Sequence, residues 1–517
     1  MQLPDYAQFC IDRLEYAGFA AYAVGGCVRD ALLGRIPHDY DLCTAATPAD
    51  TARLFADFPQ VHAGEKHGTI GVIFEKEVCE ITTFRTEGDY TDSRHPQWVS
   101  FVTDIEQDLA RRDFTINAMA YSPTRGYCDP FGGQKDLQNH ILRAVGDPEQ
   151  RFTEDALRIL RGVRFAARFH LTPEPETERA MAALAPRLHK IAAERMFDEL
   201  CHFLPVATAE DLLRYAPILS EVIPALKPCL GFEQRNRHHL YDVFTHTAHV
   251  VEGVPADLTL RWAALLHDVG KPATFTLDEN GQGHFYGHAE KSAQMADAIL
   301  RQLKAPTQLR EDVVFMVEKH MTPLPPDKKI LRRRLSQYGQ AKLTWLLQLQ
   351  KMDFCAKGVL GDTGDFDAIE AILSEILADN ACLHLKDLAV NGHDLMGLGY
   401  RGPEIGKCLQ CLLDQVLDDQ VPNEKEALLH YLKQGEHHEK HRYFSCGRRA
   451  LREPVGLPVF RRPHAAHNCP HHHHPNRPLH RSTNGSYRSH GAHHRSHGTG
   501  SGQSTGFHRL QHQQGTR

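Results

Sequence analysis

Long hydrophobic runs are missing from this sequence. Its 517 residues contain no stretch of about 18 apolar residues, so no membrane-spanning segment is expected. The opening residues MQLPDYAQFC lack the basic and apolar regions of a secretory signal, which predicts that the chain is not exported by that route. The 13 cysteines are scattered, and Cys408 and Cys411 form a CxxC without a second pair, which favours packing over zinc or redox chemistry. We therefore expect reduced thiols and a cytoplasmic protein.

Charge is unevenly distributed along the chain, and acidic residues outnumber basic ones outside the C-terminal segment. Residues 442–517 contain twelve Arg, no Lys and one acidic residue, a charge of +11, so residues 1–441 carry −17 of the total of −6. An acidic protein of this kind contacts polyanions only through local basic patches. One candidate is the run KKILRRR at 328–334, which is equally typical of a solvated helix start.

The coarse pattern divides the chain into an α/β part, a helical part and a tail. The expected elements of the first part are helices at 5–17 and 30–33 and strands at 19–24, 40–42, 69–74 and 78–85. From Asp147 to about Leu432 helical periodicity dominates, with Thr153 expected as a helix cap. Residues after Gly435 are rich in His, Arg, Pro, Ser and Gly and too poor in apolar side chains to form a core, which predicts disorder. A metal- or RNA-contacting tail and an altered reading frame are the alternatives.

A glycine turn followed by two carboxylates is the most informative feature. Gly25 and Gly26 precede Arg29 on an expected helix, and ten residues later Asp39 and Asp41 lie two apart on an expected strand. Side chains at i and i+2 of a strand share a face, where two carboxylates can hold a pair of Mg²⁺ ions. The glycines let backbone N–H groups approach a triphosphate. This combination predicts phosphoryl transfer from a nucleotide.

The segment VGGCVRDALLGRIPHDYDL resembles the signature of class II tRNA nucleotidyltransferases, the bacterial CCA-adding enzymes and their poly(A) polymerase relatives in the polymerase-beta superfamily. The resemblance extends from about residue 1 to about 434. It implies a multidomain protein with an α/β nucleotidyltransferase head that contains a small mixed sheet, followed by an all-α neck and a body. The implied parts are the catalytic head (1–146), a nucleotide-reading and RNA-binding neck (147–230), an HD domain (231–360), a tRNA-contacting helical region (361–434) and the tail (435–517).

The resemblance assigns roles to several residues of the head. It implies that Asp39 and Asp41 bind Mg²⁺ and that Gly26 and Arg29 contact the triphosphate. Glu80, on the expected strand 78–85, is a candidate third carboxylate that binds or activates the attacking 3′-hydroxyl. The alternative for Glu80 is a solvent-facing side chain on an edge strand. The segment 85–96 resembles the flexible loop that full CCA-adding enzymes keep.

Two further motifs resemble the nucleotide-binding motifs of the family. In RRDFTINAM, Arg112 is expected at the phosphates and Asp113 at a ribose hydroxyl. In EDALR, Asp155 and Arg158 are i and i+3 on an expected helix and offer an acceptor beside a donor. Such a pair selects cytosine and adenine over guanine and uracil, although a surface salt bridge has the same spacing. The resemblance also implies that Arg161 and Arg164 line the nucleotide-binding pocket. The motif ERMFDEL at 194–200 is expected to give structural support.

A second constellation follows the order of an HD domain. Its members are His246, His267, Asp268, His288, His320 and Asp353, with His267 and Asp268 in the segment LLHDVGKP, where Gly-Lys-Pro is expected to end a helix. Imidazole and carboxylate ligands suit Mn, Ni, Fe or Zn better than Mg. We expect His246, His267, Asp268 and Asp353 to hold one ion, and His288 and His320 to hold a second ion or phosphate.

The sequence thus predicts template-independent addition and repair of the 3′-terminal CCA of tRNA from CTP and ATP, by two-metal nucleotidyl transfer. A second, phosphohydrolase activity at the HD site is left open. One alternative is an A-adding enzyme or poly(A) polymerase of the same family. Another is an HD-type metal phosphohydrolase with an inactive head. The expected partners are the tRNA 3′ end, CTP and ATP, and no membrane.

Overall fold

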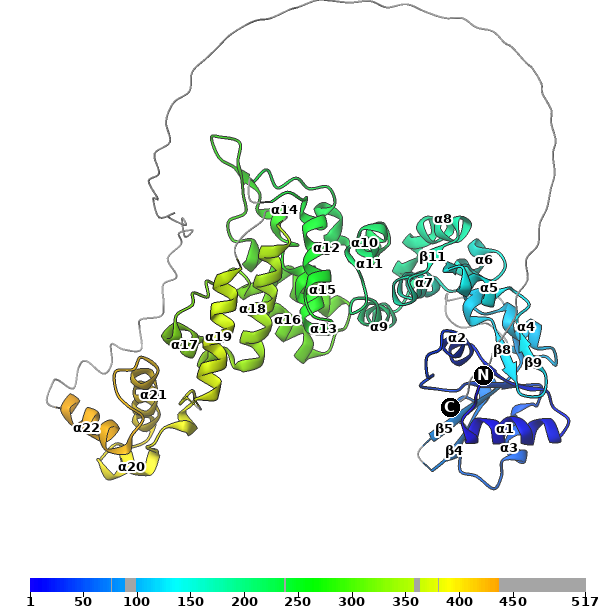
Figure 1. Ribbon diagram of the computed structural model, residues 1–517, viewed down its shortest axis with the longest axis horizontal. Helices are drawn as coiled ribbons and strands as arrows, with labels where there is room; N and C mark the ends of the chain where they lie inside the picture. The colour runs from blue at the N-terminus through cyan, green and yellow to red at the C-terminus, as the bar shows by residue number, and fades with distance from the viewer. Residues whose placement is uncertain (76, 89–98, 237–238, 358–362, 380, 437–517) are drawn as a thin grey trace, which may run out of the picture. The chain divides into compact units, whose positions relative to one another are not determined.

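The computed structural model describes residues 1–75, 77–88, 99–236, 239–357, 363–379 and 381–436 (Figure 1). Residues 437–517, nearly all of the expected tail, lie outside these ranges, as do residues 89–98 of the expected loop. No helix among the described residues is long and apolar enough to cross a membrane. The chain divides into one unit of residues 1–447 and a second of 448–517.

A seven-stranded mixed sheet organises the head, with the strand order β3-β4-β5-β2-β1-β8-β9. Its strands are β1 (Ala21–Val24), β2 (Leu42–Thr44), β3 (Gln60–Val61), β4 (Thr69–Phe74), β5 (Glu77–Thr83), β8 (Ala120–Ser122) and β9 (Gly126–Cys128). β2 and β5 run parallel, and the other neighbours are antiparallel. The small mixed sheet expected from the sequence is therefore present.

The two faces of this sheet are covered differently. Helices α1 (Asp5–Tyr16) and α3 (Pro48–Leu54) pack on one face, over a core that includes Leu42, Ile70 and Ile81 (Figure 1). On the other face α4 (Ile105–Ala110) covers the β1 and β2 region, where Leu109 joins Tyr22 and Cys43 in a second core. Toward β5, β4 and β3 this second face carries exposed side chains. Alternation along each strand explains the division, because successive side chains point to opposite faces.

Several elements differ from the sequence expectations. The helix at the glycine turn begins earlier than expected, as α2 (Gly26–Leu32). β5 ends at Thr83, and the expected loop begins as a strand, β6 (Arg85–Glu87), which pairs with β7 (Val99–Phe101) in a separate sheet. Thr153 is not a cap but lies in the last turn of α6 (Pro148–Glu154), whose cap is Asp147. An aspartate followed by proline is the stronger start signal, because proline favours the first turn.

The rest of the described chain is mainly helical. Short pairs are formed by β10 (Ile141–Leu142) with β11 (Thr172–Pro173) and by β12 (Thr276–Leu277) with β13 (Gly283–His284). The helices are α5 (Gly133–Gln138), α7 (Leu157–Phe169), α8 (Pro175–Leu184), α9 (Ala193–Phe203), α10 (Ala209–Arg214), α11 (Ala216–Val222), α12 (Val243–Gly253), α13 (Leu258–Leu266), α14 (Lys271–Thr274), α15 (His288–Gln302), α16 (Thr307–Lys319), α17 (Lys328–Tyr338), α18 (Gln340–Cys355), α19 (Gly364–Ala378), α20 (Gly392–Gly397), α21 (Pro403–Leu417) and α22 (Lys425–Glu436).

Three hydrophobic cores hold the helical part together. The largest runs from Phe114 to Leu349 and joins the helices of the expected neck to those that follow. A second lies between α17, α18 and α19, and a third, from Leu388 to Leu432, holds α20, α21 and α22 together. The domain boundaries given by the sequence stay a prediction.

Candidate active site and candidate metal centre

Asp39 and Asp41 lie in the extended segment directly before β2, not on the strand as expected. Pairing with β1 nevertheless continues, because the N–H of Val24 donates to the carbonyl of Asp41 at 3.0 Å. Tyr40, between the two carboxylates, packs edge-on against Tyr6 of α1, with 6.4 Å between ring centroids. Leu42 packs in the core under α1, so the carboxylate of the preceding Asp41 points to the opposite face of the sheet, whereas a shared face for Asp39 stays a prediction.

Glu80 lies beside Asp41. The parallel register pairs Leu42 with Ile81, so the residues one step earlier, Asp41 and Glu80, are lateral neighbours on the same face. β5 lies between β4 and β2, so Glu80 is not on an edge strand, but its side chain is exposed, as that alternative expected. Burial raises the pKa of Asp41, and the charges of Glu80 and Asp39 raise it further, against the opposing effect of Arg112. A divalent cation would relieve this repulsion.

Hard carboxylate oxygens with this repulsion fit Mg²⁺. Among the described residues, however, the groups of three or more ligand atoms within 4.8 Å of one another lie in the helical part, not at Asp39, Asp41 and Glu80. Glu80 is a lateral neighbour of Asp41, and its expected role at the attacking hydroxyl stays a prediction. The Mg²⁺ assignment itself stays a prediction.

The glycine turn and Arg112 are fitted to each other. Gly25 has φ of 76°, and its N–H donates to the carbonyl of Met119 at 3.0 Å. A Cβ on Gly25 would lie 2.9 Å from Nη1 of Arg112, so only glycine leaves room for this guanidinium. Arg112 contacts Asp108 at 3.4 Å, while its buried Nε has no hydrogen-bond partner. The guanidinium thus lies beside the turn and near enough to Asp41 to lower its pKa, and the expected phosphate contact of Arg112 stays a prediction.

Arg29 is held by protein groups. Its guanidinium donates to Asn117 at 2.5 Å and to Asp30 at 2.9 Å, and it lies over the ring of Phe169 at 4.3 Å. Only 6% of Arg29 is exposed, so a triphosphate could reach few of its donors in this arrangement. The expected triphosphate contacts of Arg29 and Gly26 stay a prediction. Asn117, which anchors Arg29, was not singled out by the sequence reasoning.

Asp113 is fully engaged within the protein. One carboxylate oxygen accepts from the N–H of Phe114 and from Asn117, and the other accepts from Nε of Arg161 at 2.8 Å. Burial alone would raise the pKa of Asp113, but Arg161 and Asn117 outweigh it and lower the value to about 2. In this structure the Asp113 carboxylate binds Arg161 of α7 and is not available to accept from a ribose hydroxyl. Its expected sugar contact remains untested.

Asp155 and Arg158 do not pair with each other as the i, i+3 spacing suggested. Asp155 ends α6 in an extended conformation, with φ of −139°, and α7 begins two residues later, so helical spacing does not apply across it. Its carboxylate accepts from Arg195 at 2.9 Å. Arg158 donates instead to Glu154 at 2.7 Å and to the carbonyls of Arg151 and Arg111.

The motif ERMFDEL supports the expected nucleotide-reading residues by direct contact. Arg195 holds Asp155, and Glu199 accepts from Arg164 at 2.7 Å and lies 3.7 Å from Arg161. The sequence reasoning gave this motif a structural role without finding these contacts. A usable signal was present, because arginines recurring every three residues on one helix need acidic partners on a neighbouring element.

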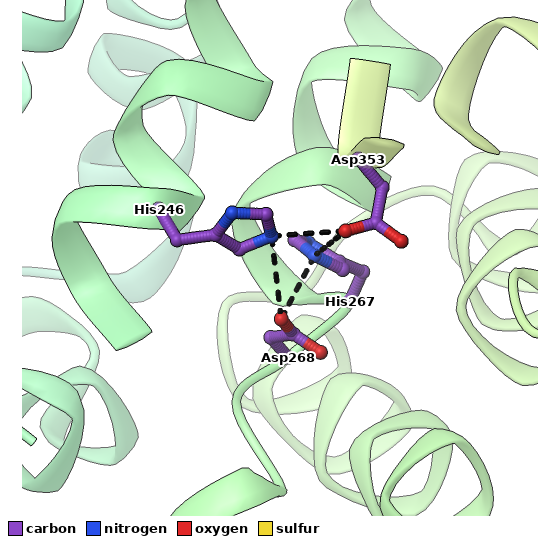
Figure 2. Close-up of side chains that lie close together, drawn as sticks. All are labelled: His246, His267, Asp268 and Asp353. Atoms are coloured by element: carbon purple, nitrogen blue, oxygen red, sulfur yellow. Dashed lines mark hydrogen bonds and ion pairs between the residues drawn. The ribbon is translucent and has the colours of Figure 1, made fainter. Parts of the chain in front are cut away.

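The HD residues form one connected cluster (Figure 2). His246, His267, Asp268 and Asp353 offer ligand atoms within 4.8 Å of one another, and Asp268 is shared with a second group that contains His288 and His320. The nearest contact joins Nε2 of His246 to Asp353 at 2.9 Å. His267 and Asp268 follow the last residue of α13. Gly-Lys-Pro does not simply end a helix, since Lys271 begins α14.

All four histidines share one orientation. Their Nδ1 atoms face backbone carbonyls, of Ala356 at 3.2 Å for His246, Ala264 at 2.7 Å for His267, Phe285 at 2.8 Å for His288 and Val317 at 2.6 Å for His320. A proton on Nδ1 leaves Nε2 free as a ligand, which is the arrangement of metal-binding histidines. The Nε2 atoms of His246, His267, His288 and His320 all lie within 4.0 Å of Asp268.

Asp268 is the shared residue of the cluster. Both its oxygens are buried and accept no well-aligned hydrogen bond, although they have ion-pair contacts. One of these is with Lys271, whose Nζ lies 2.7 Å away. The pKa of Asp268 is held well below its usual range, because His267 and Lys271 outweigh its burial. Lys271 was missed by the sequence reasoning, although its i+3 position pointed to it.

The basic run at 328–334 is neutralised within the protein. Lys328 contacts Glu375 and Asp379 of the α19 region, and Arg333 contacts Asp418 at the end of α21. Lys329 also reaches Asp418, at 3.6 Å. These ion pairs join α17 to neighbouring helices, so the run is not a free basic patch for phosphate.

Comparisons with known proteins agree with the head and the helical part. Residues 21–143 match the family described as "Poly A polymerase head domain", residues 170–230 match "Probable RNA and SrmB-binding site of polymerase A", and residues 285–432 match tRNA nucleotidyltransferase domain 2. The CCA-adding enzyme of Streptococcus gordonii is 34% identical over 427 residues, which are 82% of this chain and 96% of that enzyme. The chain belongs to the CCA-adding enzyme family. The CCA-adding enzyme of Levilactobacillus brevis is also 34% identical, over 435 residues, 82% of this chain and 96% of that enzyme.

Membership in the CCA-adding enzyme family confirms the expectation drawn from the glycine turn and the paired aspartates. Among solved structures, the Bacillus stearothermophilus CCA-adding enzyme in complex with CTP has a TM-score of 0.63 and 28% identity, and the match covers 84% of this chain and 98% of that one. An α/β nucleotidyltransferase head followed by a helical body is thus confirmed as the fold class.

Proposed function

We propose that this protein adds the 3′-terminal CCA to tRNA from CTP and ATP without a nucleic-acid template. The observation that carries the proposal is that Asp41 and Glu80 are lateral neighbours on one face of the sheet, with Asp39 close enough to add to the raised pKa of Asp41 and with Arg112 and the glycine turn nearby. The relatives named CCA-adding enzymes and the solved structure with CTP support it. We also propose that the protein acts in the cytoplasm, as expected from the sequence.

In this proposal each residue of the head has a distinct task. Asp39 and Asp41 would hold Mg²⁺, which when bound supplies charge stabilisation for phosphoryl displacement. Arg112 contributes a guanidinium that binds phosphate oxygens in a fork. Glu80 accepts a hydrogen bond from the attacking 3′-hydroxyl and orients its oxygen toward the α-phosphorus. As the hydroxyl oxygen forms the new bond to the α-phosphorus, its proton passes to Glu80 and the bond to pyrophosphate breaks, which releases pyrophosphate.

Base choice is assigned to the segment around α7. Asp155 and Arg158 provide an acceptor and a donor, and the contacts of Arg195 with Asp155 and of Glu154 with Arg158 fix their positions. Cytosine and adenine both present an amino group next to a ring nitrogen, the complement of this pair. Arg161 and Arg164, braced by Glu199, complete the proposed pocket.

The test uses tRNA lacking one, two or three 3′-terminal nucleotides and each nucleoside triphosphate separately, with sequencing of the products. We expect CMP on the substrates that lack two or three nucleotides and AMP on the substrate that ends in CC. AMP alone on every substrate, or long runs of A, would favour the A-adding enzyme or poly(A) polymerase. No addition at all would favour a protein with an inactive head.

The orientation of the four HD histidines favours a second candidate function, metal-dependent phosphoester hydrolysis at His246, His267, Asp268 and Asp353. A transition metal (Mn, Ni, Fe or Zn) bound there would supply an activated water. His288 and His320 extend the site toward a second ion or a phosphate. Metal analysis paired with hydrolysis of RNA that ends in a 2′,3′-cyclic phosphate tests this function. A protein without metal would contradict it.

A further inference from the structure

A row of neighbouring residues crosses the open face of the head sheet. The antiparallel registers pair Val61 with Gly71 and Gly71 with Glu80, and the parallel register continues the row to Asp41. Directly paired residues point to the same face, so all four share it. Next to the carboxylates the row therefore contains a glycine and then an exposed valine.

This end of the row is a shallow hollow. Its floor is apolar, because Val61 is 42% exposed and Val78, two residues before Glu80, is 51% exposed. Gly71 lies buried between the two valines, and the absence of a side chain there lets Val61 and Val78 approach each other, since a Cβ would lie 3.2 Å from both. Glu80 lines the hollow on the side toward Asp41. We call Val61, Gly71 and Val78 the valine floor.

The geometry of the reaction identifies what occupies the valine floor. Gly25 and Arg112, the groups fitted for phosphates, lie on the β1 side of Asp41. Displacement at the α-phosphorus is in line, so the attacking oxygen approaches from the side opposite to the leaving pyrophosphate. On this row that opposite side begins at Glu80 and continues over Gly71 to Val61.

We propose that the valine floor receives the 3′-terminal nucleoside of the RNA, with its 3′-hydroxyl at Glu80. This inference rests on the proposed function, because it requires the nucleotidyl transfer site at Asp41. The exposed side chains of Val61 and Val78, brought together over Gly71, contact the faces of the sugar and base. Glu80 is the charged side chain among the lining residues and holds the hydroxyl.

An apolar floor also fits the sequence of additions. During synthesis of CCA the terminal nucleoside of the RNA changes after each step, so its site must accept different bases. Contacts with ring faces tolerate any base, whereas hydrogen bonds to base edges discriminate. The floor thus separates acceptance of the RNA end from selection of the incoming nucleotide at α7.

The test is Val78→Trp, which covers the floor. Because Val78 is half-exposed, the larger side chain needs no repacking of the core, and the melting temperature should stay unchanged. We expect KM for tRNA lacking CCA to rise about tenfold, because the indole fills the hollow and displaces the nucleoside, while CTP binding without RNA stays at the wild-type value. Leu277→Trp, at a leucine 48% exposed on β12, is the control and should leave both values unchanged.

A second measurement locates the RNA end directly. tRNA lacking CCA and ending in 4-thiouridine should crosslink on irradiation to peptides that contain Val61 or Val78. Wild-type KM for tRNA in Val78→Trp, or crosslinks confined to other segments, would overturn the inference while leaving CCA addition intact. If instead wild-type protein adds no nucleotide to any tRNA, the proposed function has failed, and the inference with it.

Discussion

Asp113 and Arg161 form an ion pair of 2.8 Å that joins the RRDFTINAM motif of the head to α7. The same carboxylate is held by Asn117, which in turn accepts from Arg29 beside the glycine turn. On the other side Arg161 lies 3.7 Å from Glu199 of α9. Residues assigned to triphosphate, sugar and base thus belong to one chain of contacts, so a displaced member is expected to disturb its neighbours.

The first prediction concerns the pH dependence set by Asp113. Its pKa is lowered from 3.8 to about 2, so the carboxylate stabilises the fold at pH values above its unfolded pKa. That contribution, about 2 kcal/mol, is lost as pH falls from about 4 to about 2. Unfolding of wild type and Asp113→Asn should therefore differ at pH 6 and approach each other only as the pH falls to about 2. Curves that stay parallel over this range would contradict the depressed pKa.

The second prediction concerns base choice. Asp155→Ala and Arg158→Ala should lose discrimination against U and G by roughly tenfold to hundredfold, the effect of a lost donor or acceptor. Arg158→Ala should also lower the melting temperature, because its side chain is buried and bonded to Glu154. Arg301→Ala, which removes an exposed pair with Asp297, is the control. Equal slowing of all four nucleotides would show that the pair is structural.

The third prediction concerns Arg195. Arg195→Ala removes the ion pair that positions Asp155, so it should weaken C and A discrimination in the same direction as Asp155→Ala but less. Arg195→Lys keeps the charge and should recover part of the effect. Because both act through one carboxylate, the double variant Arg195→Ala/Asp155→Ala should resemble Asp155→Ala alone. Additive losses of discrimination in the double variant would show that Arg195 and Asp155 act independently, which would contradict this prediction.

The fourth prediction concerns the HD cluster. Wild-type protein should contain a transition metal, and His267→Ala/Asp268→Ala should not. Chelators that strip this metal should leave Mg²⁺-dependent nucleotide addition unchanged, because the head offers carboxylates and the cluster offers imidazoles. Metal content is measured by elemental analysis. A bound metal without hydrolysis of cyclic phosphate would assign the cluster a structural role.

The sequence predicted the candidate site residues better than it predicted the contacts between them. The i, i+2 spacing predicted that Asp39 and Asp41 share a face; the strand begins only after them, so the shared face stays a prediction for Asp39, while Leu42 fixes the direction of Asp41. It expected Asp155 and Arg158 to be neighbours on one helix face, because it did not recognise that the helix is interrupted between α6 and α7. Such a break depends on how the two helices pack, which local periodicity does not encode.

Contacts between residues far apart in the sequence were the hardest to predict. The register that places Glu80 beside Asp41 depends on strand order, and the single sequence left Glu80 undecided between catalysis and an edge strand. The six HD residues were found because ordered His and Asp residues are rare by chance. Lys271 was overlooked because Gly-Lys-Pro was interpreted only as the end of a helix.

The most direct test of the central claim is the sequence of the product formed from tRNA lacking CCA, with CTP and ATP both present. Wild-type protein should append CCA and stop, and Asp39→Asn/Asp41→Asn should append nothing while still binding tRNA, since the paired carboxylates are the proposed metal ligands. No product from wild type, continued addition of A, or CCA from the double variant would contradict the account.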